Sequence, residues 1–178
     1  MSLPPSSSES VGFDLLEPRI QRWIWAAGWT SLRDAQERAI PALLGADQDV
    51  IIAAATAAGK TEAAFLPILT NLLQNTENPG AVLYISPLKA LINDQWDRLA
   101  RLCDELELPV IAWHGDISAS RKHRFLKSPE GILLITPESL EALFVNKGTS
   151  LAGLFANLRY LVVDELHAFI GSERGKQL

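Results

Sequence analysis

The sequence predicts an α/β fold, an open and mostly parallel sheet with helices on both faces. The first observation is a set of five short apolar runs, at residues 49–54, 81–86, 109–114, 131–136 and 159–164. Their cores, such as Val-Leu-Tyr-Ile and Ile-Leu-Leu-Ile, are continuously apolar, which is typical of strands buried on both faces of a parallel sheet. The second observation is that a segment of helix length separates most of these runs from the next.

Helices are expected between these strands and before the first of them. Helical segments between the strands are predicted at residues 60–74, 88–106, 118–127 and 137–147. Upstream, a helix is expected to begin at Pro18 and to stop at Gly28, because glycine is a common helix terminator. A second upstream helix fits residues 31–44, with Ser31 as its N-cap and an apolar stripe through Ala39.

Length and composition indicate one globular domain. A chain of 178 residues suits a single core, and 48% hydrophobic with 21% charged residues is an ordinary soluble balance. We therefore expect a domain over residues 11–178. Residues 1–10 are polar and rich in serine and proline, so they are expected to be a disordered tail or a remnant of cloning.

Hydropathy and cysteine content bear on location. No apolar run reaches the length of a membrane span, and the N-terminus lacks the basic and apolar regions of a secretory signal. The single cysteine, Cys103, rules out an internal disulfide and is compatible with a reducing cytosol, so a cytoplasmic protein without a membrane segment is expected. Cys103 is interpreted as structural, because its acidic neighbours disfavour a reactive thiolate.

A loop of small residues follows the first apolar run and leads directly into a helix. It reads Ala54-Ala55-Thr56-Ala57-Ala58-Gly59-Lys60-Thr61. Small residues let backbone N–H groups curl around the phosphates of ATP, while Lys60 would reach the β- and γ-phosphates and the Thr61 hydroxyl would hold Mg²⁺. Ala54 stands where the general pattern has glycine, so the loop must hold its turn with ordinary dihedrals. The alternative is a helix N-terminus that happens to spell Gly-Lys-Thr.

Two carboxylates, Asp164 and Glu165, end the fifth apolar run. Buried carboxylates are costly unless a charge or a metal meets them, and the Mg²⁺ of ATP prefers carboxylate oxygen, usually through water. We expect Asp164 to hold the Mg²⁺ shell through water, and Glu165 to orient and deprotonate the attacking water. Ligands of open parallel sheets sit at the carboxyl ends of the strands, so Lys60 is expected to converge with both acids on one pocket. The alternative is a pair of solvated acids.

Together, the loop at 54–61 and the segment Asp164-Glu165-Leu166-His167 resemble superfamily 2 helicases of the DExH kind. The resemblance covers nearly all of residues 12–178 and implies the RecA-like fold of the P-loop NTPases. By this likeness Gln36 binds the adenine edge with its amide, and Phe13 is the aromatic that packs near the base. The alternative for Phe13, as for Trp23, Trp25 and Trp29, is core packing.

Three further motifs resemble those with which the family grips the nucleic-acid backbone; they are Ser86–Leu91, His114–Asp116 and Thr136–Leu140. The resemblance implies contacts from Pro87, Lys89, Gly115, Thr136, Pro137 and Ser139. Physically, each motif puts a helix N-terminus at one edge of the sheet, where phosphates bind without any reading of bases. The net charge of −5 counts against bulk electrostatic binding, so local contacts must carry it. The alternative for Thr136 is an ordinary N-cap.

The combined motifs are most similar to the large helicase-related proteins of bacteria and archaea. This likeness implies one lobe of a two-lobed motor, whose partners are DNA or RNA and a second, C-terminal RecA-like lobe that the chain lacks. His167 would couple hydrolysis to lobe closure, or alternatively cap the strand end. We expect the chain alone to bind Mg-nucleotide weakly and to hydrolyse it negligibly. A nuclease-associated translocase, a non-helicase P-loop enzyme such as a kinase, and a non-catalytic interaction module stay open as alternatives.

Overall fold

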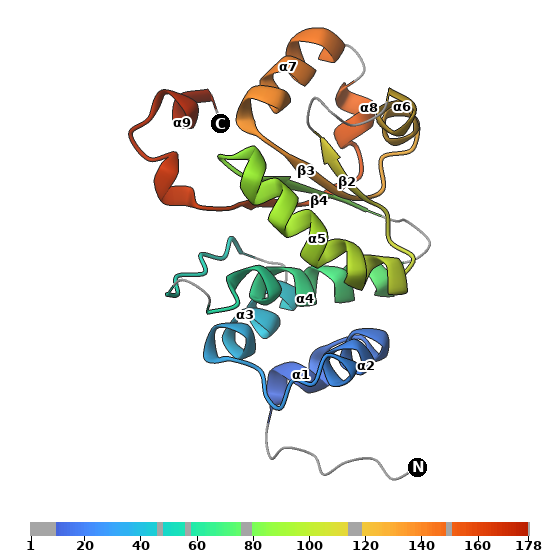
Figure 1. Ribbon diagram of the computed structural model, residues 1–178, viewed down its shortest axis with the longest axis vertical. Coiled ribbons are helices and arrows are strands. Elements are labelled where there is room, and N and C mark those ends of the chain that lie inside the picture. The colour runs from blue at the N-terminus through green and yellow to red at the C-terminus, as the bar shows by residue number, and fades with distance from the viewer. Residues whose placement is uncertain are drawn as a thin grey trace. The chain divides into compact units, whose positions relative to one another are not determined.

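The computed structural model describes residues 10–45, 48–55, 58–75, 80–113, 119–148 and 151–177 (Figure 1). Contacts within the chain divide it into two compact units, Met1–Thr76 and Glu77–Leu178. The expected boundary between a tail at 1–10 and a domain at 11–178 stays a prediction, since residues 1–9 lie outside the described ranges. In the described part of the chain, none of the helices combines the length and the apolar character that crossing a bilayer requires.

The described elements of the first unit are helices: α1 Val11–Leu15, α2 Pro18–Ala26, α3 Asp34–Gly45 and α4 Lys60–Gln74. Helix α2 begins at Pro18 as predicted, because the Glu17 side chain accepts a hydrogen bond from the Arg19 N–H and proline suits the first helical position. The chain leaves this helix through Gly28, whose φ of +74° is a conformation that favours glycine. Both predicted ends of α2 are therefore confirmed to within two residues.

The predicted N-cap of α3 is wrong. The helix begins at Asp34, three residues beyond Ser31. The backbone carbonyl of Arg33 accepts hydrogen bonds from the N–H groups of Gln36 and Glu37, each at 2.9 Å. In return the Gln36 side chain accepts a bond of 2.9 Å from the Arg33 N–H, which is the reciprocal half of a capping box. The bond between the Arg33 N–H and the Gln36 side chain sets the start of the helix at Asp34, and Ser31 takes no part in it.

The predicted strand at residues 49–54 is also wrong. The backbone of residues 48–55 forms no strand, and the side chain of Ile51 is 80% exposed. A strand is stabilised by hydrogen bonds to a neighbouring strand, and the described elements of the first unit are helices that provide no such neighbour. The apolar run has the composition of a strand but lacks a pairing partner within its own unit.

Helix α4 has the predicted bounds and is the most deeply buried helix of the first unit. Its buried residues include Phe65, Leu66, Ile68 and Leu69, and the helix packs closely against α3. Thr70 is buried as well, and its hydroxyl donates to the Leu66 carbonyl at 2.9 Å, which satisfies a polar group in an apolar setting. This packing holds rigid the helix whose first turn carries Lys60 and Thr61.

The second unit contains a four-stranded parallel sheet with helices (Figure 1). Its elements are β1 Ala81–Ile85, α5 Lys89–Glu105, β2 Val110–Trp113, α6 Ala119–Lys127, β3 Gly131–Ile135, α7 Pro137–Lys147, α8 Leu151–Phe155, β4 Leu158–Val163, η2 Leu166–Ala168 and α9 Glu173–Gln177. The strands lie in the order β2-β3-β1-β4, and every pair is parallel. Their carboxyl ends therefore meet at one edge, as the sequence predicts.

Helices cover both faces of this sheet. Leu83 and Ile85 of β1 lie beside Leu133 and Ile135 of β3, and all four belong to a core cluster. The same cluster includes Phe125 of α6, Leu140 and Leu143 of α7, and Leu151 of α8. Helix α5 packs on β2 and β3, and its buried residues are not part of that cluster. The central strands β1 and β3 are buried along their whole length, while β4 is partly exposed, with Leu161 at 58%.

Cys103 should be unreactive in the folded protein. It is a buried free thiol on α5, and burial, with a smaller contribution from Asp104, raises its pKa from 9.0 to about 12. Because the nucleophile is the thiolate, labelling by a maleimide at pH 7.5 should be slow for the native chain and fast in urea. Rapid stoichiometric labelling of the native chain would contradict this expectation.

The same thiol should contribute a pH dependence to stability. Its folded-state pKa is raised, so the stability that it contributes is present below the unfolded value of 9.0 and is lost as the pH rises toward about 12. Above pH 9.0, the urea midpoint of the wild-type protein should fall more steeply with pH than that of Cys103→Ala. Equal slopes for the two proteins would count against the assignment.

Candidate functional site

The described part of the phosphate-type loop turns without strain at its alanines. The Ala58 N–H donates to the Ala55 carbonyl at 3.1 Å, and Gly59 caps α4 with φ +78° and ψ +33°. Among the described residues, the non-glycine residues with positive φ are Glu107 and Glu165, so Ala54, Ala55 and Ala58 have ordinary angles, as expected. Thr56 and Ala57, which belong to the same predicted binding set, lie outside the described residues.

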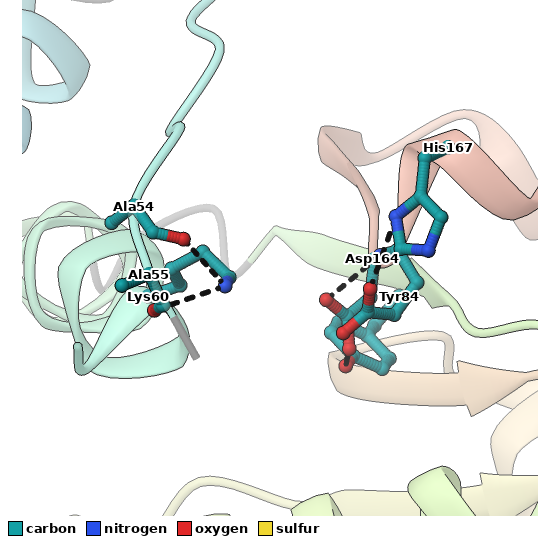
Figure 2. Close-up of polar contacts among 7 residues, drawn as sticks. Ala54, Ala55, Lys60, Tyr84, Asp164 and His167 are labelled. Atoms are coloured by element: carbon teal, nitrogen blue, oxygen red, sulfur yellow. Dashed lines mark hydrogen bonds and ion pairs between the residues drawn. The ribbon is translucent and has the colours of Figure 1, made fainter. Parts of the chain in front are cut away.

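Lys60 turns its ammonium group back onto this loop. Its Nζ donates to the Ala54 carbonyl at 2.9 Å and approaches the Ala55 carbonyl at 3.4 Å (Figure 2). Lys60 and the half-buried Thr61 lie in the first turn of α4, at the end of a helix where backbone N–H groups have no acceptor within the helix itself. A helix N-terminus, an ammonium and a hydroxyl at one point form a suitable site for phosphate and its Mg²⁺.

Gln36 connects the upstream segment to this loop. Its side chain is 1% exposed; its Oε1 accepts from the Arg33 N–H, and its Nε2 donates to the Gly59 carbonyl at 3.5 Å. The structure therefore brings Gln36 next to the loop that the sequence assigns to phosphate. The amide has a second N–H and a second lone pair beyond these two bonds, and its role in adenine binding stays a prediction.

Gly59 has a backbone conformation that glycine adopts readily and that other residues rarely adopt. A Cβ atom would lie 2.5 Å from Gln36 Nε2, and the φ of +78° disfavours every L side chain. Gly59→Ala should lower the free energy of unfolding by about 1–2 kcal/mol. Gly148→Ala is the control, because Gly148 has a helical φ of −45° and open space around its Cβ position. Urea unfolding followed by circular dichroism measures both, and equal midpoints for the two variants would contradict the assignment.

The upstream aromatic residues pack on one another. Phe13 meets Trp25 edge to face with ring centroids 6.2 Å apart, and Trp23 meets Trp29 in the same way at 5.7 Å. Such pairs stabilise a fold beyond their buried area. Core packing does not hold for Trp25, which is 45% exposed, and Trp23 and Trp29 are only half-buried. A contact of Phe13 with a base stays a prediction.

Asp164 lies at the carboxyl edge of the sheet with both carboxylate oxygens engaged. Its N–H donates to the Ile85 carbonyl at 2.9 Å, which extends the β1–β4 ladder by one residue. Oδ1 accepts from the Glu165 N–H at 2.9 Å, and Oδ2 accepts from the Tyr84 hydroxyl (Figure 2). Each carboxylate oxygen can accept more than one hydrogen bond, so acceptor capacity remains for a water of a Mg²⁺ shell.

Glu165 has a backbone conformation that is uncommon for a side-chain-bearing residue. Its φ of +50° and ψ of +45° are left-handed, at a cost of roughly 1–3 kcal/mol. Such strain concentrates at functional sites, which supports a role for this carboxylate beyond packing. Its Oε2 lies 3.2 Å from Nδ1 of His167, a side chain that is 80% exposed. The described contact of His167 is thus with the acidic pair, and its coupling role remains untested.

Tyr84 is a residue of this site that is not among those expected from the sequence. In the sequence Tyr84 lies inside an apolar run, which predicts a buried strand and gives no sign of a polar contact. Register makes the difference: Tyr84 pairs with Val162, and Asp164 follows two residues later on the same face of β4.

The candidate nucleic-acid residues of the second unit occupy the same carboxyl edge. Ser86, directly after β1, donates its N–H to the Ile135 carbonyl at 3.1 Å, so the loops after β1 and β3 lie side by side. Pro87 is buried, and Lys89 is exposed at the start of α5. Gly115 lies outside the described residues.

Thr136 is an ordinary helix N-cap, as the alternative interpretation predicts. Its Oγ1 accepts from the Ser139 N–H at 3.3 Å and lies 3.1 Å from the Ser139 hydroxyl, while Pro137 occupies the first turn of α7. In this first turn the Ser139 and Leu140 N–H groups are both bonded to Thr136, and Pro137 has no N–H group to offer a phosphate. Contact with nucleic acid therefore stays a prediction for Thr136, Pro137 and Ser139.

Magnesium and ATP suit the side chains that are present. Mg²⁺ is usually held by one or two carboxylates, a hydroxyl, substrate phosphates and water, and Asp164 and Thr61 supply groups of these kinds. Lys60 and Thr61 belong to the first unit, whereas Asp164 and Glu165 belong to the second. Their convergence around one nucleotide remains a prediction.

Comparisons with known proteins agree with these motifs. The family model for DEAD/DEAH box helicases matches residues 33–178. The ATP-dependent helicase Lhr-Core of Saccharolobus solfataricus is 32% identical over 185 residues, a match that covers 97% of this chain and 21% of that protein. The chain thus spans only about a fifth of the length of this curated relative.

Two solved helicase structures are similar in fold and related in sequence. The DUF1998 helicase MrfA, bound to DNA and AMPPNP, gives a TM-score of 0.76 at 28% identity, covering 88% of this chain and 22% of that one. The Mycobacterium smegmatis helicase Lhr, bound to ssDNA and AMP-PNP, gives 0.75 at 27% identity, covering 93% and 22%. The parallel sheet with its helices is that of a RecA-like helicase domain. The chain belongs to the DEAD/DEAH box helicase family.

Proposed function

We propose that this chain is the first motor domain of an ATP-dependent DNA or RNA helicase or translocase, and that it binds Mg-ATP and a nucleic-acid backbone. The observation that carries the proposal is the presence of two sets of groups, called half-sites here, that have the chemistry phosphate and Mg²⁺ require. One is the α4 N-terminus with Lys60 and Thr61, and the other is the Asp164–Glu165 pair at the end of β4. The names of the relatives support ATP use.

In the proposed site each half supplies different groups. Lys60 exchanges its bonds to the loop carbonyls for oxygens of the β- and γ-phosphates, and the first-turn N–H groups of α4 complete the cradle. Thr61 and, through water, Asp164 hold the Mg²⁺, which neutralises phosphate charge when it is bound. Glu165 orients the attacking water and accepts its proton. Gln36 binds the adenine edge.

The proposed nucleic-acid track is the carboxyl edge of the second unit's sheet. Lys89 supplies a cation, and the first turn of α5 supplies backbone N–H groups. Pro87, Thr136, Pro137, Ser139 and Gly115 complete the set. The two similar solved helicases hold DNA, which supports a nucleic-acid strand as the partner.

We also propose that the motor requires a second RecA-like lobe. The relatives are about five times longer than this chain, since it covers only 21% and 22% of two of them. An arginine supplied by such a lobe stabilises charge on the γ-phosphate and contributes about 10³–10⁵ in rate. The chain alone should therefore bind Mg-nucleotide weakly and hydrolyse it negligibly. A cytoplasmic location is proposed as well, and the free buried thiol of Cys103 supports it.

Titration with a fluorescent ATP analogue, with and without Mg²⁺, tests the binding proposal on this chain. Saturable binding that requires Mg²⁺ is expected for the wild type and for Lys147→Ala, which alters an exposed lysine on α7. Absence of such binding would favour a non-catalytic interaction module. Robust ATP hydrolysis by the 178 residues, stimulated by DNA or RNA, would refute the need for a second lobe.

A further inference from the structure

Tyr84 and Asp164 are joined by a hydrogen bond across two strands that are 80 positions apart in sequence. The tyrosine hydroxyl donates to Oδ2 of the carboxylate (Figure 2). Tyr84 is only 2% exposed and lies near the end of β1, a strand that is buried along its whole length. The tyrosine end of the contact is therefore shielded from water, whereas Asp164 is half-buried.

The register of the sheet places the two side chains of this contact on the same face of neighbouring strands. Tyr84 pairs with Val162, and the Asp164 N–H bonds to the Ile85 carbonyl. Asp164 is thus two residues beyond the partner of Tyr84 and points to the same face. Two residues of strand span roughly 6–7 Å, which is about the reach of a tyrosine side chain along the strand.

The bond constrains the carboxylate from a second side. The Glu165 N–H donates to Oδ1, and the Tyr84 hydroxyl donates to Oδ2. With one donor on each oxygen, the carboxylate group is held in a single orientation. A carboxylate that is already oriented loses little rotational freedom when it binds a water of the Mg²⁺ shell. Neighbouring groups that orient a metal-binding residue in this way have a strong effect on metal affinity.

We infer that Tyr84 is a positioning residue for magnesium binding: it acts through Asp164, whose carboxylate it orients toward the waters of the Mg²⁺ shell. The inference rests on the proposed Mg-nucleotide site. It assigns a role to a residue that otherwise reads as sheet core, and it predicts that loss of a single hydroxyl group weakens Mg²⁺ binding without loss of the fold.

Tyr84→Phe tests the inference, because it removes the hydroxyl and keeps the ring in its packed place. Nucleotide binding by the full chain is followed with a fluorescent ATP analogue while Mg²⁺ is titrated. The Mg²⁺ concentration for half-saturation should rise about tenfold, at the lower end of the effect of losing such a supporting group. Binding of the analogue at saturating Mg²⁺ should change little. Tyr160→Phe is the matched control, since Tyr160 is the other of the chain's two tyrosines and lies on β4 of the same sheet.

A double-mutant cycle separates positioning from packing. If Tyr84 acts through Asp164, then Tyr84→Phe should shift the Mg²⁺ dependence strongly in the wild type and not at all in Asp164→Asn. A shift of the same size in both backgrounds would show a merely structural effect and overturn the inference. So would a Tyr84→Phe curve that coincides with those of the wild type and Tyr160→Phe, and in that case the proposed nucleotide site would stand. Absence of Mg²⁺-dependent binding in the wild type would overturn both.

A measurement on the intact chain decides the matter if Tyr84→Phe does not fold. Labelling with 3-fluorotyrosine gives two ¹⁹F resonances, one for each tyrosine, and Tyr160→Phe assigns them. Addition of Mg²⁺ with nucleotide should shift the Tyr84 resonance, and Asp164→Asn should abolish that shift. A Tyr84 resonance that does not respond to Mg²⁺ while nucleotide binds would overturn the inference.

Discussion

Lys60→Ala in the full-length protein is expected to reduce nucleic-acid-stimulated ATP hydrolysis by roughly 10²–10³-fold, the usual effect of removing one preorganised charge-stabilising donor. In the structure the Lys60 ammonium donates to the carbonyls of Ala54 and Ala55. Its removal leaves two neutral carbonyl groups that water can reach, and it leaves no buried charge without a partner. The variant should therefore fold normally and lose activity. Steady-state ATP hydrolysis, with the melting temperature measured alongside, checks both statements.

Lys147→Ala is the matched control for Lys60→Ala. Lys147 lies in the last turn of α7 and is exposed, and it belongs to neither half-site. Its removal should leave hydrolysis within a factor of about two of the wild type. Retention of full activity by Lys60→Ala would exclude the phosphate role of the loop and favour the interpretation of a helix start that happens to spell Gly-Lys-Thr.

Glu165→Gln should lower ATP turnover by roughly 10²–10⁴-fold, because glutamine has the shape of glutamate but cannot accept the proton of the attacking water. The substitution also removes the charge that faces His167 at 3.2 Å. Nucleotide affinity should be retained, since Asp164 and Lys60 keep their groups. Single-turnover hydrolysis and nucleotide titration on the same preparation separate the two effects.

Glu173→Gln provides the control for Glu165→Gln. Glu173 pairs with Lys176 on the exposed surface of α9, so the control also removes one carboxylate from an ion pair. Its turnover should equal that of the wild type. If Glu165→Gln lost nucleotide affinity together with turnover, the carboxylate would be a binding group, and its role as general base would be wrong.

Short-range signals were sufficient for much of the fold. The start of α7 follows from Thr136 and Pro137, which cap and open the helix within a single turn. The same holds for α4 after Gly59, and for the central strands β1 and β3, whose continuously apolar sequences require burial on both faces. The residues of both half-sites could be proposed for a related reason, since phosphate and Mg²⁺ chemistry demands particular residue types next to one another in the chain.

What only the tertiary structure decided depends on partners that are distant in sequence. Residues 49–54 have the composition of a strand, but an isolated run has no ladder to join within its unit. The Tyr84–Asp164 bond arises because β1 and β4 are neighbours in the order β2-β3-β1-β4. Apolar periodicity records which residues are buried, whereas strand adjacency depends on how the whole chain packs, so no local pattern encodes it.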